Sequence, residues 1–186
     1  MSGYLVPIII GAVVLLLIFW VVGRYNAFVK GRNMTEEAFS TMDVYLKKRW
    51  DLVPNLVETV KGYAKHESET IENVIRARSA AYDGMSPDEK IDANQQLSAG
   101  LGRLMAIAEQ YPDLKANTLF VNLSNQLGSI EQDIANARKY YNGVARQFNN
   151  TIMVFPGNMI AGMFGFKKQK MFETDAASRE NVEVKF

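Results

Sequence analysis

A single uninterrupted apolar run near the start of the chain limits what the sequence can fold into. It extends from Leu5 to Val22, reads LVPIIIGAVVLLLIFWVV and contains no charged residue. A helix of this length, rising about 1.5 Å per residue, just crosses a hydrocarbon core of about 30 Å. Tyr4 before it, and Trp20 and Tyr25 at its other end, suit the interfacial depth where amphipathic rings settle. The run predicts one membrane-spanning helix, whose residues include Leu5, Val6, Ile8, Leu15, Leu16, Phe19 and Trp20.

The flanks of this run differ from those of a cleaved signal peptide. Such a peptide has a basic start, a shorter apolar region and a small-x-small cleavage site. Here the residues before the run carry no side-chain charge, and no Ala-x-Ala follows it. The chain has no cysteine, which excludes a lipoprotein anchor. We therefore expect the span to be retained.

Basic residues beside the run predict its orientation. Arg24, Lys30 and Arg32 follow the run, whereas only the free amino group precedes it. Cytoplasmic flanks of membrane helices carry the excess of Lys and Arg. We therefore expect the N-terminus outside the membrane and the rest of the chain in the cytoplasm.

The remainder of the chain has the size and composition of one soluble domain. Of 186 residues, about 160 follow the span, which is a usual domain length. The 21 basic and 20 acidic residues are interleaved and leave a net charge of +1, so we expect no nucleic-acid partner. Without cysteine, the chain forms no disulfide, thiolate zinc site, iron–sulfur cluster or cysteine nucleophile.

Apolar residues recur in steps of three and four through most of this domain, which is typical of helices packed in a bundle. Whether the membrane helix is interrupted at Gly31-Arg32-Asn33 or continues into the first bundle helix stays open. The first apolar stripe is interrupted at the seam by one polar residue, Arg49. Its apolar members are Phe39, Met42, Leu46, Val53, Val57, Val60, Ala64, Ile71 and Val74.

Pro54 lies within this stripe and allows two topologies. Inside a helix it removes a hydrogen bond and bends the axis, whereas at a helix start it is welcome. The preceding Asp51-Leu52-Val53 lacks the glycine that is typical of a reversal. We favour one long, kinked helix through about Ala81 over a hairpin. In the kinked form, three long helices project from the membrane and Phe155–Phe166 lies far from the span; in the hairpin form, that segment returns to the bilayer.

A turn at residues 82–87 separates this first part from the later helices. Ser86, Pro87 and Glu89 have the spacing of a capping box with proline in the first helical position. We expect this helix to end at Pro112 and Asp113 to cap the next one.

The last long helix has the most regular pattern. From Ala116 to Thr151 its apolar residues alternate by four and three, the heptad of a left-handed, coiled-coil-like seam. The predicted architecture is all-α: an N-terminal transmembrane helix followed by an antiparallel bundle of three to four long helices. The polar face of the last helix is expected to be solvated surface and comprises Asn122, Gln126, Glu131, Asp133, Lys139 and Arg146.

The segment after this helix has a different character. Phe155-Pro156-Gly157 breaks the helix, and a short, glycine-rich apolar stretch leads directly into Lys167, Lys168 and Lys170. Apolar residues beside lysines are typical of a membrane-surface segment, but a cap over the end of the bundle core is also consistent with the pattern. Both alternatives stay open for Phe155, Met159, Ile160, Met163, Phe164 and Phe166. We divide the chain into tail and span (residues 1–23), bundle (24–154), and this segment with its polar tail (155–186).

No arrangement of residues points to catalysis. The one histidine, His66, excludes a bundle di-metal site, which needs a Glu-x-x-His motif on each of two helices. No phosphate-binding glycine loop follows a strand pattern, and no Ser-His-Asp set can be placed. We assign no catalytic, cofactor-binding or metal-binding residue, and we expect a non-enzyme.

Several motifs resemble those of the LemA family and occur in the same order. The longest is DLVPNLVETVKGYAKHE at residues 51–67; the others are YN at 25–26, YPDLKAN at 111–117, ARKYYN at 137–142 and FPGNMIAGMFGF at 155–166. The resemblance implies a bacterial inner-membrane protein with a short outer tail and a cytoplasmic helical bundle. It implies no catalytic residue. Genes of this family often neighbour those of membrane-bound zinc proteases, which implies a partner of that kind.

Two functions are consistent with these features. We favour a non-enzymatic scaffold that is held in the lipid bilayer and forms homo-oligomers, because attachment raises the effective concentration and the heptad helix offers a long seam. The alternative is an adaptor or regulator of a membrane-bound protease in envelope quality control. Its docking face would comprise Asp51, Asn55, Lys61, His66 and Glu67, whose alternative role is capping and solvation around Pro54.

Overall fold

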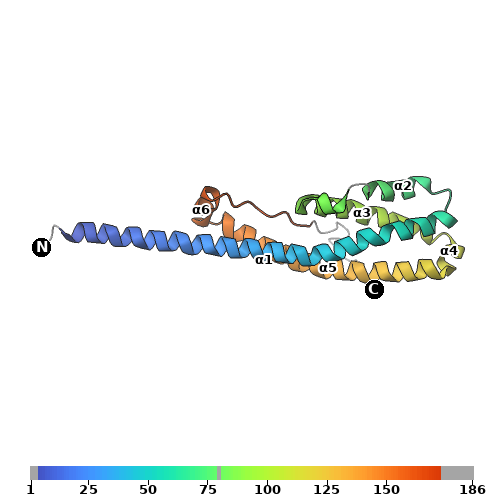
Figure 1. The fold of residues 1–186 in the computed structure, drawn as a ribbon, viewed down its shortest axis with the longest axis horizontal. Coiled ribbons are helices and arrows are strands. Elements are labelled where there is room, and N and C mark those ends of the chain that lie inside the picture. The colour runs from blue at the N-terminus through green and yellow to red at the C-terminus, as the bar shows by residue number, and fades with distance from the viewer. Residues whose placement is uncertain (1–3, 79–80, 173–186) are drawn as a thin grey trace, which may run out of the picture. The chain divides into compact units, whose positions relative to one another are not determined.

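The computed structural model describes residues 4–78 and 81–172, and within these ranges every regular element is a helix (Figure 1). This confirms the all-α prediction. The apolar start of the first helix is long and apolar enough to cross a membrane, and none of it is buried. The elements are α1 (Leu5–Tyr63), α2 (Ser68–Ala77), the short 3-10 helix η2 (Tyr82–Gly84), α3 (Pro87–Ala108), α4 (Pro112–Ala116), α5 (Thr118–Met153) and α6 (Gly157–Met163).

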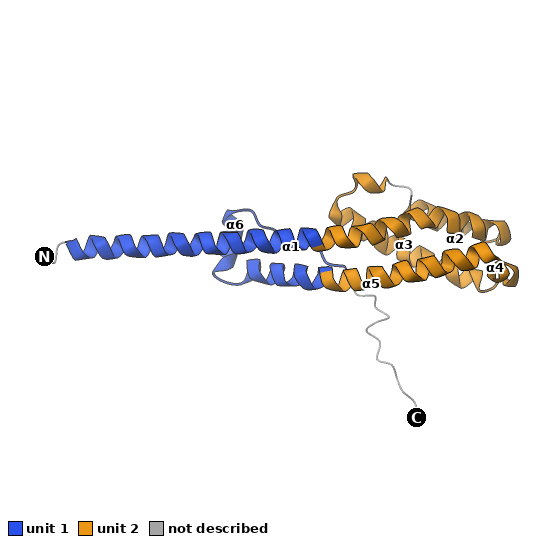
Figure 2. Ribbon diagram, turned by 60° about the horizontal axis from the view of Figure 1, so that its bottom comes forward, with its two compact units in different colours: residues 1–37, 141–186 blue, residues 38–140 orange. Residues whose placement is uncertain are grey.

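The chain divides into two compact units (Figure 2). Unit 1 comprises residues 1–37 and 141–186, and unit 2 comprises residues 38–140. Helices α1 and α5 each contribute one part to unit 1 and another part to unit 2.

Unit 2 is an antiparallel bundle of four helical segments. The second part of α1, α2, α3 and the first part of α5 follow one another in alternating directions (Figures 1 and 2). Gly100 of α3 lies so close to α2 that a Cβ there would be 3.2 Å from Val74 Cγ2, so the two helices are in close contact at this glycine. The buried core includes Met42, Leu46, Val53, Leu56, Val60, Val74, Ile91, Leu97 and Leu104.

The capping box predicted at the start of α3 is confirmed, whereas the predicted cap of the last helix is wrong. Ser86 Oγ accepts from the Glu89 amide, and the Ser86 amide donates to Glu89 Oε2 at 2.7 Å. Pro112 starts a short extra helix, α4, so Asp113 lies inside that helix instead of capping α5. The cap of α5 is Asn117, whose Oδ1 accepts from the Phe120 amide at 3.0 Å.

Pro54 lies inside α1, which also passes through residues 31–33 without interruption. The favoured single helix is therefore confirmed, but its predicted end near Ala81 is wrong, because α1 ends at Tyr63. The chain reverses over residues 64–67, where the Glu67 amide donates to the carbonyl of the buried, small Ala64 at 3.2 Å. This turn needs neither glycine nor proline, which is why the sequence pattern did not reveal it.

The early reversal overturns the expectation that a helix continuous at Pro54 keeps Phe155–Phe166 far from the span. Because α2 adds one more pass, α5 ends beside the part of α1 that follows the span, within unit 1 (Figure 2). There a buried cluster joins α1, α5 and α6, with Val21 and Phe166 packed against it. Its members are Phe28, Phe148, Ile152, Ile160 and Ala161.

Candidate membrane-proximal site

The segment after α5 packs directly on the first turns of α1 beyond the span. The ring of Tyr25 lies 4.9 Å from that of Phe164 and 5.8 Å from that of Phe166, both edge-on. The ring of Phe28 lies 5.4 Å from Phe166. Since Tyr25 follows Val22 by three residues, a helical rise of about 1.5 Å per residue puts these contacts about 5–10 Å beyond the span. For a span that ends at Val22, this is the depth of the lipid headgroups and the water just above them.

A glycine allows this close approach. A Cβ at Gly157 would lie 2.7 Å from Arg24 Nη2 and 3.0 Å from the Thr151 carbonyl oxygen. The guanidinium of Arg24 lies 5.5 Å from the centre of the Phe28 ring. Arg24, two residues beyond the predicted span, therefore packs half-buried against the end of α5 and the start of α6.

Helix α6 has one buried and one exposed face. Ile160 and Ala161 are buried against α1 and α5. On the other face Met159 is 66% and Met163 70% exposed, and Phe155 in the preceding turn is 76% exposed. Phe164, which contacts Tyr25, remains 49% exposed. The sequence left two roles open for six residues of this segment. In the structure, some of the six pack against the core and the others face outward.

Two asparagines of α5 hold the extended chain that follows α6. Asn149 donates from Nδ2 to the Gln169 carbonyl at 2.9 Å and accepts from the Gln169 amide at 2.7 Å. Asn142, two helical turns earlier, makes the same pair of bonds with Phe172, at 3.0 and 2.9 Å. The Tyr141 hydroxyl donates to the Lys170 carbonyl at 2.7 Å. These bonds use only the backbone of residues 169–172 and fix where the neighbouring lysines lie.

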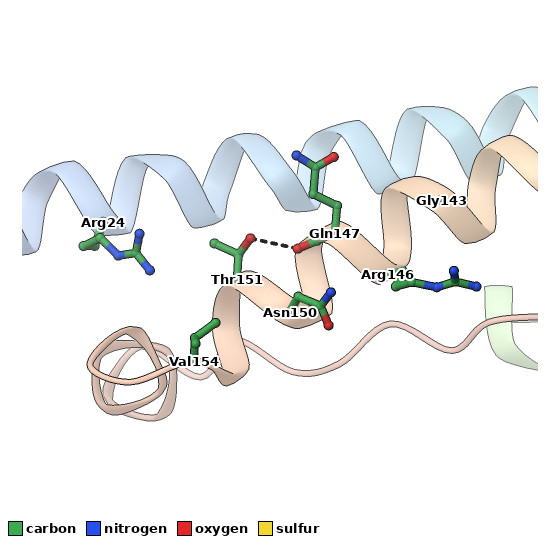
Figure 3. Close-up of a pocket in the computed structure, with 7 residues that line it drawn as sticks. All are labelled: Arg24, Gly143, Arg146, Gln147, Asn150, Thr151 and Val154. Atoms are coloured by element: carbon green, nitrogen blue, oxygen red, sulfur yellow. Dashed lines mark hydrogen bonds between the residues drawn. The ribbon is translucent and has the colours of Figure 1, made fainter.

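A shallow groove of about 470 Å³ crosses the outer face of α5 in unit 1 (Figure 3). Arg24 and Arg146 lie towards its two ends, with Asn150 and Thr151 between them, and the two guanidinium groups do not converge. Thr151 Oγ1 donates to the Gln147 carbonyl at 2.7 Å, so this hydroxyl is engaged within its own helix. The groove is basic but has no enclosed anion site.

A buried arginine joins three helical segments of unit 2. Arg49 of α1, with a side chain 2% exposed, donates to Glu131 Oε1 of α5 at 2.8 Å. It also donates to Ser98 Oγ at 2.8 Å and to the backbone and side-chain oxygens of Asn94, at 3.0 and 2.9 Å. A buried charge is tolerated when it is paired and hydrogen-bonded. Glu131, expected on a solvated face, is therefore the counter-charge of Arg49.

A second polar cluster lies around Asp43. Its two carboxylate oxygens accept from the Tyr82 hydroxyl and from Lys90 Nζ, each at 2.6 Å. Burial, reinforced by the hydrogen bond to Asp43, raises the pKa of Tyr82 well above its ordinary value. Tyr82 is therefore a firmly protonated donor at neutral pH, not an acid–base group.

The five candidate docking residues lie at the end of α1 and in the turn after it. Asp51, Asn55, Lys61 and His66 are exposed, while Glu67 is half-buried and accepts from the Tyr111 hydroxyl at 3.4 Å. Asp51 pairs with Lys47 at 2.8 Å, one helical turn away. In residues 4–78 and 81–172, no group of three or more His, Asp or Glu side chains is placed to hold a metal ion.

Sequence reasoning missed the Arg49 cluster and the two clamping asparagines. A signal for the first existed, because Arg49 interrupts an apolar stripe at a seam position. The signal for the second was weaker: Asn142 and Asn149 are seven residues apart, so they share one helix face.

The comparisons with known proteins agree with the resemblance noted in the motifs. The chain is 28% identical over 170 residues to Protein LemA of Metamycoplasma hominis, covering 89% of this chain and 76% of that protein. It is 26% identical over 180 residues to the magnetosome proteins MamQ 1 and MamQ 2 of Paramagnetospirillum magneticum, covering 83% of this chain and 66%, just under two thirds, of each relative. The model of the LemA family matches residues 38–186. The chain belongs to the LemA family.

Proposed function

We propose that this protein is a non-enzymatic scaffold that is anchored in the bacterial inner membrane by residues 5–22 and associates with further copies of itself. The names of its relatives describe no enzyme. The buried polar side chains Arg49 and Asn94 are engaged in packing the bundle, as described above. The first observation favours a non-enzymatic role, and the second gives these two polar side chains a structural one.

The heptad seam of α5 is not the surface that would join two copies. Its central positions, including Leu127, Ile134 and Tyr141, are buried within the chain itself. The surplus seam on which the sequence argument for self-association rested is therefore occupied. A scaffold of this kind needs another apolar surface.

One observation in unit 1 supplies that surface. A largely apolar groove of about 280 Å³ lies between α1 and α5, with Met34 50% exposed at its rim. Copies anchored in the same direction in one membrane present this groove at the same height, and tethering raises their effective concentration. A second copy is therefore the occupant we assign to it. The groove is lined by Ala27, Lys30, Gly31, Met34, Val144, Gln147, Phe148 and Thr151.

The absence of cysteine makes the test direct. Met34→Cys introduces a single thiol, and oxidation in native membranes should yield a disulfide-linked dimer. Asn33→Cys is the matched control, because Asn33 is exposed at nearly the same height but points about 100° away around the helix. Equal cross-linking of both variants, or a monomer at every expression level, contradicts the proposal.

The orientation belongs to the same proposal. The N-terminus lies outside, and the bundle lies in the cytoplasm. Arg24, Lys30 and Arg32 support this placement because they follow the span immediately. A thiol-reactive reagent that does not cross membranes should fail to label Met34→Cys in intact spheroplasts and should label it after lysis.

The adaptor function is kept as the second candidate because Asn55, Lys61 and His66 are each exposed, near the end of α1 and in the following turn. Affinity purification of the Asn55→Ala/Lys61→Ala variant separates the two functions. An adaptor loses a membrane-protease partner while Met34→Cys cross-linking persists. A pure scaffold keeps the same set of co-purifying proteins.

A further inference from the structure

We infer that α6 and the lysines after it form a second membrane contact, which lies on the surface of an anionic bilayer beside the span. This membrane-contact face consists of Phe155, Met159, Met163, Phe164, Lys167 and Lys168. The inference rests on the membrane anchor of the proposed function but not on self-association.

The first support is charge. The described residues of unit 1 contain seven basic residues and two acidic ones, Glu36 and Glu37, which lie at the end of its first segment. The even mixture of charges in the whole chain therefore does not hold within unit 1. Arg24, Lys167 and Lys168 have no acidic partner within the described residues. The seven basic residues are Arg24, Lys30, Arg32, Arg146, Lys167, Lys168 and Lys170.

The second support is position. Through Phe164 the segment contacts Tyr25, and through Gly157 it contacts Arg24. Both partners lie within about 5 Å of the end of the span along the helix, inside a headgroup layer about 5–7 Å thick. The span and the membrane-contact face thus meet the bilayer at one continuous place. No bending of unit 1 is needed to bring them together.

The third support is the exposed apolar surface. Met159 and Met163 are one turn apart on the outer face of α6, and each is about two thirds exposed. Apolar side chains beside lysines are the composition of interfacial helices, which bury one face at the headgroup boundary while cations meet anionic lipid. An anionic bilayer satisfies both kinds of side chain at once.

The ligand is the charged surface as a whole, not one headgroup. The guanidinium groups of Arg24 and Arg146 lie apart (Figure 3), so the groove on α5 does not chelate a single phosphate. Binding should therefore follow the density of negative charge in the membrane. Phosphatidylglycerol and cardiolipin should act equally at equal charge.

The experiment uses the full chain reconstituted in vesicles. A nitroxide label is attached to Met163→Cys in vesicles of phosphatidylcholine with about one third phosphatidylglycerol. Frequent collisions of this label with oxygen indicate contact with lipid, and we expect them at this position. The matched control is Gly143→Cys, about 15 Å along α5 from the end of that helix at Met153, where an added Cβ meets nothing within 4 Å. That site should report water. Met159→Cys serves as the second probe if the first disturbs α6.

The charge is tested separately. Lys167→Gln/Lys168→Gln should lower the ratio of docked to undocked α6 about 30-fold, since each cation near an anionic surface contributes about 1 kcal/mol, or about fivefold. Vesicles of pure phosphatidylcholine should give at least as large a loss, because they remove the attraction of the other basic residues as well. Both lysines are exposed, so the fold should be unaffected, as a circular-dichroism melt would show.

Two outcomes overturn the inference. If the label at Met163 is as accessible to water in anionic vesicles as the label at Gly143, the membrane-contact face is solvated and the inference is wrong. If the label at Met163 is shielded from water but loses this shielding when the protein is diluted among vesicles, a second copy of the chain covers the membrane-contact face. Because dilution abolishes self-association but not lipid contact, this arm separates a failure here from a failure of the scaffold proposal.

Discussion

The side chain of Arg78 donates from Nε to the backbone carbonyl of Trp50 at 3.0 Å. In a regular helix that carbonyl would accept from the amide four residues later, but that residue is Pro54, which has no N–H. Arg78, at the end of α2, therefore supplies the donor that proline removes from α1. This explains how a helix of 59 residues tolerates an internal proline.

The compensation predicts coupling between the two positions. Arg78→Met should lower the free energy of unfolding by about 1–3 kcal/mol, because the Trp50 carbonyl is left without a partner. In a Pro54→Ala background, the backbone of the new alanine supplies the missing amide, and the same change should cost at least about 1 kcal/mol less. Urea unfolding followed by Trp50 fluorescence, with Trp20→Phe to remove the other tryptophan, measures both. Equal costs in the two backgrounds would sink this account of Pro54.

The buried charge of Arg49 makes its counter-charge indispensable. Glu131→Met leaves the guanidinium without its carboxylate and should cost about 2–4 kcal/mol, less than for a fully buried pair because Glu131 is 41% exposed. Arg49→Met/Glu131→Met removes both charges and should be more stable than Glu131→Met alone. Urea midpoints of the three proteins decide the order. A double variant less stable than the single variant contradicts it.

Local features of the fold were visible in the sequence, and distant pairings were not. The capping box at Ser86 and the heptad of α5 depend on residues a few positions apart, so spacing alone revealed them. The bond from Arg49 to Glu131 joins residues 82 positions apart. Only the completed bundle shows that a residue on an apparently solvated face is the partner of a buried one.

The topology was misjudged for a similar reason. Before the turn at residues 82–87, only Pro54 was considered as a place where the chain could reverse, because proline and glycine are the usual signals. The actual turn at residues 64–67 relies on backbone bonds and on the small, buried Ala64. The position of the segment after α5 therefore could not be predicted until the number of helical passes was known.

Tyr82 gives the bundle a specific weakness at high pH. Its pKa is raised in the folded protein by burial and by Asp43, whereas in the unfolded chain it is near 10. Its contribution is therefore fully present below pH 10 and is lost as the pH rises further, at up to about 1.4 kcal/mol per pH unit. Tyr82→Phe should reduce the slope of stability against pH between about pH 10 and 11.5. An unchanged slope would mean that another group dominates.

The asparagine clamps should control the exchange of two backbone amides. Asn149→Ala removes the acceptor of the Gln169 amide, and Asn142→Ala removes that of Phe172. Each change should speed hydrogen exchange at its own amide about tenfold or more, since local opening then costs at least about 1.4 kcal/mol less. Asn150→Ala, next to Asn149 on the groove side of α5, is the control and should leave both amides unchanged. Acceleration at both amides by any single change would indicate one cooperative segment.

Glycine at position 157 should be required for α6 to pack on α1, and the chain contains its own control. Gly157→Ala places a Cβ 3.0 Å from the Thr151 carbonyl oxygen, a backbone atom that cannot rotate away, and 3.3 Å from Phe28 Cζ. Overpacking of this kind costs about 1–3 kcal/mol, which should appear as faster exchange of α6 amides. Gly162→Ala lies in the same helix, where an added Cβ meets nothing within 4 Å, and should slow exchange because alanine favours helix. If both variants behave alike, helix propensity and not close approach governs this segment, and the position of α6 beside Arg24 no longer depends on Gly157.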